Sequence, residues 1–129
     1  CISSEHRNIL VILTDAYIYH KNSEFKEGNK TSYLTPQLIR SLSLNQSNWS
    51  DLISKNNYGY IPANKDLTNL EVLVIGINPE KNNPFEGEVI RTFWENWLTE
   101  MGVKNFKIVE SDLPSNLEKV ISDFISKPN

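Results

Sequence analysis

The stretch "NILVILTD", residues 8–15, indicates the fold more strongly than any other part of the chain. Five apolar residues, three of them β-branched, are followed directly by Thr14 and Asp15. Such a run predicts a β-strand buried on both faces of a parallel sheet. The run "LEVLVIGI", residues 70–77, predicts a second strand of the same kind. The segment "NFKIVE", residues 105–110, alternates apolar and polar residues, which is typical of a strand nearer the edge of a sheet.

Apolar side chains recur every three or four residues in two longer segments. Between Gly87 and Met101 they form one broad face, which predicts a helix packed on the sheet. The sequence "SNLE", residues 115–118, is typical of a capping box at the start of a closing helix. Shorter helices are predicted from Thr35-Pro36 and around Trp49. The polar stretches 21–33 and 56–66 are predicted to be loops.

The predicted order of elements is β-α-α-β-α-β-α, which implies an α/β fold. A Rossmann-like parallel sheet layered with helices would result, in a single domain spanning residues 1–129. Two of the three strands read as central, and a central strand needs a neighbour on each side. We therefore expect the sheet to be incomplete in this chain, with its remaining strands in a missing N-terminal half or in a second chain.

The composition excludes some classes of protein. Thirteen basic and sixteen acidic residues give a net charge of −3, and no basic block is present, so nucleic-acid binding is not expected. No apolar run approaches the roughly 20 residues of a transmembrane helix. The single cysteine, Cys1, excludes an internal disulfide. The location of the protein stays open between the cytoplasm and the cell exterior, where a lipid anchor on Cys1 would hold it. No nucleotide-binding or acyl-transfer motif is present, which favours a protein that is not an enzyme.

The candidate functional residues lie where the predicted strands end. Ligand sites in open α/β sheets form beyond the carboxyl ends of the strands, and Asp15 follows such a strand directly. Its carboxylate suits a hard divalent cation such as Mg²⁺, although a loop aspartate that caps a backbone amide fits the position equally well. His20 lies five residues further on and adds a second titratable group. Glu80, Glu86 and Glu88 follow the second strand, where they either coordinate a cation or stabilise the start of a helix.

The segment "RNILVILTDAYIYH", residues 7–20, resembles the fourth-strand segment of von Willebrand factor type A domains. In that family the strand runs into Thr-Asp-Gly, and the aspartate belongs to the metal-ion-dependent adhesion site. The later order of elements is also similar to the C-terminal half of such a domain. The resemblance implies a metal-site role for Asp15, whereas Ala16 stands where the family has glycine. The family's principal motif, Asp-x-Ser-x-Ser, does not occur in these 129 residues.

Three hypotheses about function follow. The leading hypothesis is an interaction or adhesion module of the von Willebrand factor A type, which binds a protein partner and holds Mg²⁺ at Asp15. The alternative is a metal-dependent α/β hydrolase that uses Asp15 and His20. The third is a structural module in which Asp15 only caps a loop.

Overall fold

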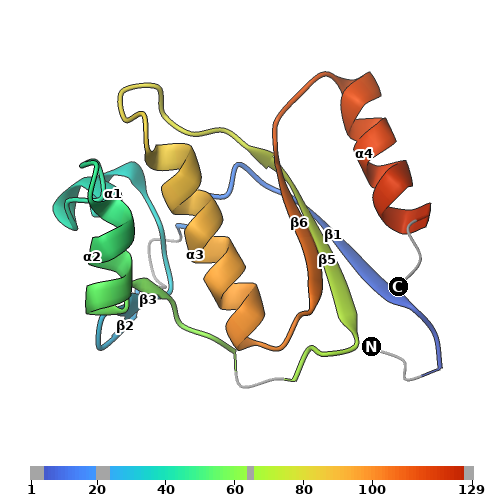
Figure 1. Cartoon of the computed structure of the whole chain (residues 1–129), viewed down its shortest axis with the longest axis horizontal. Coiled ribbons are helices and arrows are strands. Elements are labelled where there is room, and N and C mark those ends of the chain that lie inside the picture. The colour runs from blue at the N-terminus through green and yellow to red at the C-terminus, as the bar shows by residue number, and fades with distance from the viewer. Residues whose placement is uncertain (1–4, 20–23, 64–65, 127–129) are drawn as a thin grey trace.

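Three parallel strands form the main sheet, in the order β1-β5-β6 (Figure 1). The computed structural model describes residues 5–19, 24–63 and 66–126. Within them β1 (Asn8–Leu13), β5 (Leu70–Ile77) and β6 (Asn105–Glu110) occupy the three segments predicted as strands. All the pairings between these strands are parallel. The predicted α/β class with a parallel sheet is therefore confirmed.

One helix packs on each face of this sheet. Alternate residues of β5 point to opposite faces, so Val72 and Val74 contact the core beneath α3 (Glu86–Glu100), whereas Leu73 and Ile75 pack with α4 (Pro114–Ser126). Figure 1 shows α3 and α4 beside different parts of the sheet. Within the described ranges, no helix is long and apolar enough to cross a bilayer.

The segment between β1 and β5 forms a smaller lobe beside α3. Its helices are α1 (Pro36–Ser41) and α2 (Trp49–Asn56), both predicted from the sequence. Thr35 caps α1, since its hydroxyl accepts the Leu38 amide at 3.1 Å. The rest of the lobe includes a small sheet of two-residue strands, β2 (Lys26–Glu27), β3 (Lys30–Thr31) and β4 (Gly59–Tyr60). The prediction of loops alone was wrong for these strands.

Aromatic rings join the small lobe to the sheet. The ring of Tyr60 contacts Phe93, Trp94 and Trp97 of α3 edge-on, with centroid distances of 5.5, 5.9 and 5.5 Å. Trp94 also meets Trp97 edge-on at 5.5 Å. Offset and edge-on pairs of this kind are worth about 0.5–1.5 kcal/mol each beyond the area that they bury. The cluster therefore ties β4 firmly to α3.

The prediction that β1 is buried on both faces was wrong. β1 lies at the edge of the sheet, with β5 as its neighbour on one side. Leu10 is 44% exposed and Leu13 is 76% exposed. Only β5 is central among the three strands of this sheet, and its residues 71–75 are buried throughout.

The start of α4 also differs from the prediction. Pro114 is the first residue of the helix, where its missing amide hydrogen costs nothing, so Ser115 lies inside the first turn. The expected capping box is therefore absent from this turn. Instead, the Asp112 carboxylate accepts the Leu113 amide at 2.7 Å and the side-chain amide of Asn116 at 3.2 Å. These two donors lower the pKa of Asp112.

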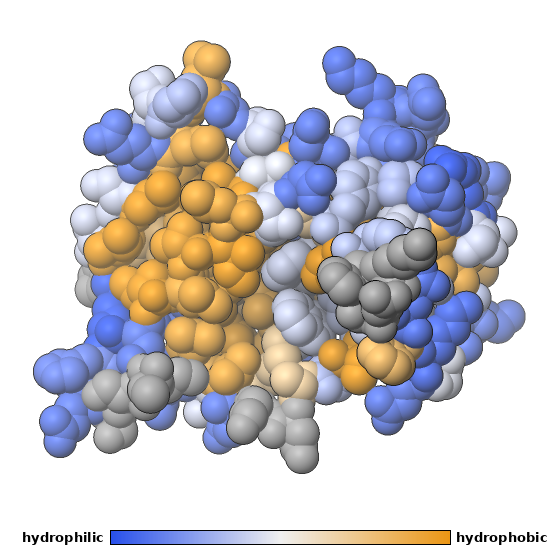
Figure 2. All heavy atoms as spheres, turned by 180° about the vertical axis from the view of Figure 1, so that it is seen from behind, coloured by the Kyte–Doolittle hydropathy of each residue, from blue (hydrophilic) through white to orange (hydrophobic). Residues whose placement is uncertain are grey.

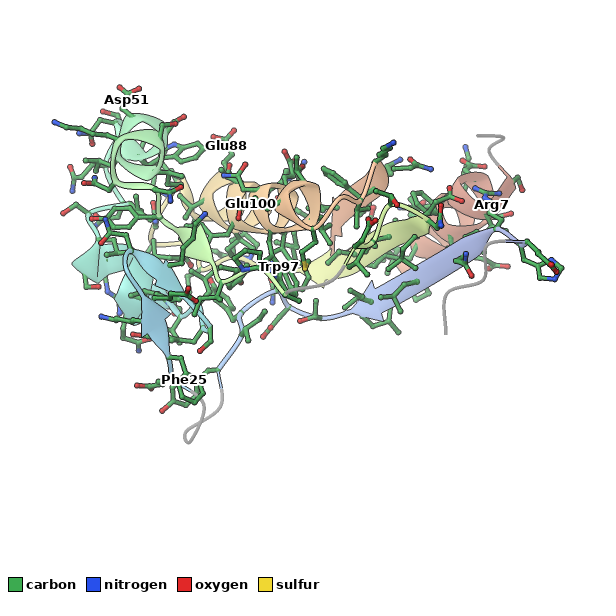
Figure 3. All side chains as sticks on the ribbon, turned by 90° about the horizontal axis from the view of Figure 1, so that it is seen from below. Arg7, Phe25, Asp51, Glu88, Trp97 and Glu100 are labelled. Carbon is green, nitrogen blue, oxygen red and sulfur yellow. The ribbon has the colours of Figure 1, made fainter. Side chains whose placement is uncertain are left out.

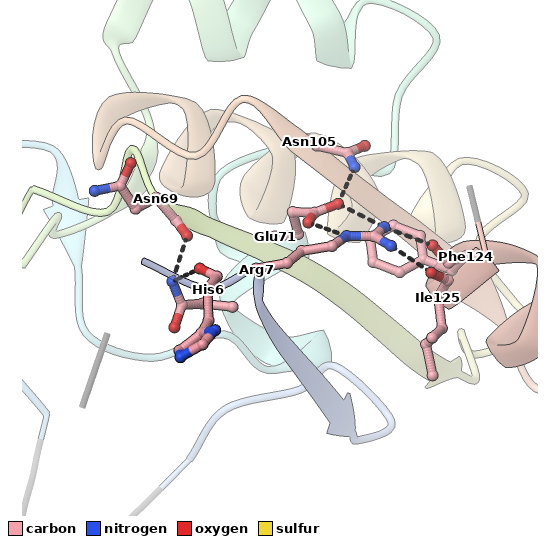
Figure 4. Close-up of polar contacts among 8 residues, drawn as sticks. His6, Arg7, Asn69, Glu71, Asn105, Phe124 and Ile125 are labelled. Atoms are coloured by element: carbon pink, nitrogen blue, oxygen red, sulfur yellow. Dashed lines mark hydrogen bonds and ion pairs between the residues drawn. The ribbon is translucent and has the colours of Figure 1, made fainter. Parts of the chain in front are cut away.

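An ion pair fastens the start of β1 to the rest of the sheet (Figure 4). Arg7 donates to both carboxylate oxygens of the buried Glu71, at 2.5 and 3.0 Å. Arg7 also donates to the carbonyl oxygens of Phe124 and Ile125 near the end of α4. Asn105 of β6 donates to Glu71 at 2.5 Å. This network joins β1, β5, β6 and α4 at the amino-terminal edge of the sheet.

Candidate functional site

Asp15 lies at the carboxyl-terminal edge of the sheet, as predicted. Its backbone carbonyl accepts the Asn78 amide at 3.4 Å, just after β5, and the Ser111 amide donates to the Ile77 carbonyl at 3.0 Å. The loops that follow β1, β5 and β6 therefore begin side by side, which is where open α/β sheets bind ligands. The residue is exposed to solvent.

The side chains of Thr14 and Asp15 stabilise the turn that follows β1. Thr14 Oγ1 accepts the Ala16 amide at 3.0 Å, and Asp15 Oδ1 accepts the Tyr17 amide at 3.1 Å. Both contacts are the local turns that these residue types commonly form. The capping role considered for Asp15 is thus present. In the part of the chain that the structure describes, its second oxygen, Oδ2, has no hydrogen-bond partner.

Ala16 adopts a backbone conformation that normally belongs to glycine. Its φ angle is +75°, in the left-handed region that costs a residue with a Cβ about 1–2 kcal/mol. The residue is fully buried, and its carbonyl accepts the Tyr60 hydroxyl at 3.3 Å and the Trp94 indole nitrogen at 3.2 Å. The alanine therefore keeps a glycine-like turn, and two aromatic side chains hold that turn in place behind Asp15.

A buried carboxylate connects this turn to the loop after β5. Glu86 is 1% exposed, and its Oε2 accepts the Tyr17 hydroxyl and, at 2.9 Å, the Glu80 amide. Burial raises the pKa of Tyr17, and its hydrogen bond to the Glu86 carboxylate raises that pKa further. Glu86 therefore positions the loop and does not face a cation in solvent.

Two polar atoms beside this connection have no hydrogen-bond partner among the described residues. They are Glu86 Oε1 and Asn83 Nδ2, both buried. Sequence reasoning identified Glu86 as a candidate but missed its contact with Tyr17, because the two residues lie 69 positions apart and no periodic pattern links them.

The other predicted acidic residues do not join Asp15. Glu80 forms an exposed ion pair with Arg40 at 3.5 Å, and Glu88 is exposed in the first turn of α3 (Figure 3). Among the described residues, no group of three His, Cys, Asp or Glu side chains could hold a metal ion. Asp15 therefore stands as a single carboxylate at this edge among the described residues, and a cation such as Mg²⁺ would need further oxygen ligands from elsewhere. His20 lies outside the described residues, so its pairing with Asp15 stays a prediction.

No protein-family model, curated protein or solved structure matches this chain significantly. The resemblance to von Willebrand factor type A domains accordingly rests on residues 7–20 and on the order of elements.

The outer edge of β1 is the second candidate surface. The Thr14 amide donates to Ile75 of β5 at 3.0 Å, so the backbone groups of even-numbered residues in β1 point toward β5. By the same alternation, the amides and carbonyls of Ile9, Val11 and Leu13 point away from it. We call residues 9–13, with this row of backbone groups, the β1 surface. Figure 2 shows a broad hydrophobic area on the side of the molecule where β1 and α4 lie.

Proposed function

We propose that this chain is a protein-interaction module of the von Willebrand factor A type. Its sheet would be extended at the β1 surface by a strand from outside the described residues, contributed by a missing N-terminal half or by a second chain. Asp15 would supply one ligand to a divalent cation such as Mg²⁺ at the adjoining edge. The observation that carries the proposal is that β1, an apolar strand, lies at an edge of the sheet with no strand paired to its outer side among the described residues.

Strand addition fits the chemistry of this edge. The outward backbone groups of Ile9, Val11 and Leu13 offer donors and acceptors in a regular row, which an added strand can pair with. The exposed side chains of Leu10 and Leu13 supply apolar area on the two faces of the same strand. Native sheets usually protect such an edge with charges, proline or a covering element. Residues 8–13 contain neither a charge nor a proline, which supports a covered edge in the working assembly.

The cation part of the proposal rests on the position of Asp15. Its carboxylate is exposed, and it lies at the junction of two loops and beside the open edge of the sheet. A strand added to β1 would end or begin next to Asp15, so the incoming segment could contribute the remaining oxygen ligands. Mg²⁺ often binds through one or two carboxylates and keeps several waters. A single carboxylate from this chain is therefore enough as its contribution to such a site.

Hydrogen exchange tests the strand addition. The probe is the peptide of residues 8–13 flanked by lysines for solubility, added to the isotopically labelled chain. We expect slower exchange at the amides of Val11 and Leu13, because these amides would become hydrogen-bonded. Leu13→Lys should abolish this protection, whereas Leu113→Lys, a control at a leucine that is 66% exposed outside β1, should preserve it. Protection absent from β1, or equal in the two variants, contradicts the proposal.

Calorimetric titration with Mg²⁺ and Mn²⁺ tests the cation separately. We expect binding that Asp15→Ala removes and Asp112→Ala preserves, in the chain together with any residues that its gene encodes before Cys1. A complete lack of heat and of thermal stabilisation in that protein would exclude the cation and leave the strand addition to its own test.

A further inference from the structure

The small lobe contains a cavity that the proposed interaction does not use. Its volume is about 620 Å³, within the range of roughly 300–1,000 Å³ that is typical of small-molecule sites. We call it the tyrosine pocket. The side chains that matter for its chemistry are Tyr19, Tyr33, Glu24, Lys26, Gln37 and Ser41.

Local pairing explains why two tyrosines meet in this pocket. Ile18 and Leu34 form an antiparallel bridge with backbone hydrogen bonds of 3.0 and 2.7 Å. The next residues along, Tyr19 and Tyr33, are therefore opposite each other and present their rings to the same face. Tyr19 is 57% exposed, whereas Tyr33 is half-buried. Both residues line the pocket and give it two rigid, amphipathic rings.

Helix α1 contributes further lining side chains to the pocket. Gln37 and Ser41 are four residues apart, so they lie on one side of the helix. Leu38, which is 7% exposed, contributes an apolar side chain to the lining. Gln37 carries both a donor and an acceptor, and the Ser41 hydroxyl donates to the Leu38 carbonyl at 2.8 Å while its lone pairs can still accept.

The charges of the pocket balance each other. Glu24, which also forms a hydrogen bond with Tyr19, contributes a negative group just before β2, and Lys26 of β2 contributes a positive one. A phosphate or another strongly charged ligand would leave one of these groups opposed by a like charge. A neutral ligand with many hydroxyl groups matches both, since each of its hydroxyls can donate to Glu24 and accept from Lys26.

We infer that the tyrosine pocket binds a neutral pyranose sugar. The faces of the tyrosine rings are electron-rich and attract the weakly positive C–H groups of a sugar ring, while Glu24, Lys26 and Gln37 hydrogen-bond its hydroxyls. The site is separate from the β1 surface and from Asp15, so it stands whether or not the proposed function is correct.

Titration of the labelled chain with D-glucose, D-galactose and N-acetyl-D-glucosamine, followed by NMR, tests the assignment. We expect saturable shifts at Tyr33, Gln37 and Ser41 with at least one sugar. Tyr19→Ala should weaken binding about tenfold, because it removes one of the two rings. The matched control is Phe25→Ala, which removes a ring that is 63% exposed next to Glu24 in the sequence (labelled in Figure 3). Phe25 is not among the residues that line the pocket.

Three outcomes would overturn the inference. The first is a lack of saturable shifts with all three sugars, and the second is equal weakening by Tyr19→Ala and Phe25→Ala. The third is saturable binding of inorganic phosphate or L-lysine in the pocket with no binding of the sugars, which would assign the pocket to a charged ligand. Because Tyr19 is largely exposed, its replacement is expected to leave the fold intact, and the unshifted amides of β5 provide the check.

Discussion

Replacing Gly76 with alanine should destabilise the protein strongly at the edge that carries Asp15. Gly76 has a φ angle of +112°, outside the regions that residues with a Cβ readily adopt, and it lies at an irregularity in the pairing of β5 with β6. A Cβ atom built at this position would lie 2.7 Å from the carbonyl oxygen of Thr14 and 3.4 Å from its carbonyl carbon. Both are backbone atoms, so a side-chain rotation cannot relieve the contact.

The structure sets the size of the effect. The unfavourable φ angle costs about 1–3 kcal/mol, and forcing an extra methyl group into a filled space adds about 1–3 kcal/mol. We therefore expect the free energy of unfolding to fall by about 3 kcal/mol for Gly76→Ala. At about 4 °C per kcal/mol for a chain of this size, the midpoint of thermal unfolding should fall by about 12 °C.

Gly28→Ala is the matched control. Gly28 also has a positive φ, +62°, but a Cβ atom there would have nothing within 4 Å. Its replacement should lower the free energy of unfolding by about 1 kcal/mol, because only the left-handed conformation becomes unfavourable. Urea unfolding followed by tryptophan fluorescence, to which the buried Trp94 contributes, measures both variants. If the two variants lose the same stability within about 0.5 kcal/mol, the close approach of Thr14 to Gly76 is not what constrains this edge.

Three further predictions concern buried polar groups. Glu71→Ala should lower the free energy of unfolding by about 3 kcal/mol, since it breaks a buried network, whereas Glu110→Ala at the exposed end of β6 should change it by less than about 0.5 kcal/mol in the same urea experiment. Tyr17→Phe should cost about 1–2 kcal/mol in thermal unfolding at neutral pH, because Glu86 Oε2 loses a donor; an unchanged midpoint would argue against that contact. Burial raises the pKa of Tyr60 above its ordinary value of 10.0, so its contribution to stability is complete below pH 10 and is lost as the pH rises beyond it. Between pH 9 and 12 this group should therefore make the free energy of unfolding fall by up to about 1.4 kcal/mol per pH unit. Tyr60→Phe should remove that contribution to the slope.

The main strands were predictable because burial leaves a direct signature in the sequence. The apolar runs that predicted β1 and β5, and the alternation that predicted β6, are visible without any knowledge of the neighbouring strands. The position of β1 in the sheet was not predictable in the same way. An apolar run is the same whether a strand is central or lies at an edge, so Leu10 and Leu13 carried no sign of their exposure.

Smaller features escaped prediction for other physical reasons. Two-residue strands such as β4 are too short to show a period, and their pairing depends on contacts distant in the sequence. The capping box was misassigned because Pro114 suits the first helical position and takes Ser115 into the helix.

The sequence predicted where the candidate site lies in the fold, but it did not identify all the residues that form it. The junction between the apolar strand and Asp15 identified the correct edge of the sheet, but the residues that hold its loop come from far along the chain. Tyr17 meets Glu86, and Ala16 meets Trp94, only after the helix has packed on the sheet. Local sequence patterns contain no information about such contacts.

The open edge of β1 also has a consequence for the synthesis of the protein. The hexapeptide of residues 8–13 lacks proline, glycine and charge, which is the composition of segments that form steric zippers. Its pairing partner begins only at Leu70, so a ribosome would need roughly 3–10 s to complete the gap. During that interval the nascent segment can pair with copies of itself. Aggregation of the nascent chain should accordingly decrease when fewer copies are made at one time, or when a chaperone holds this hexapeptide apart.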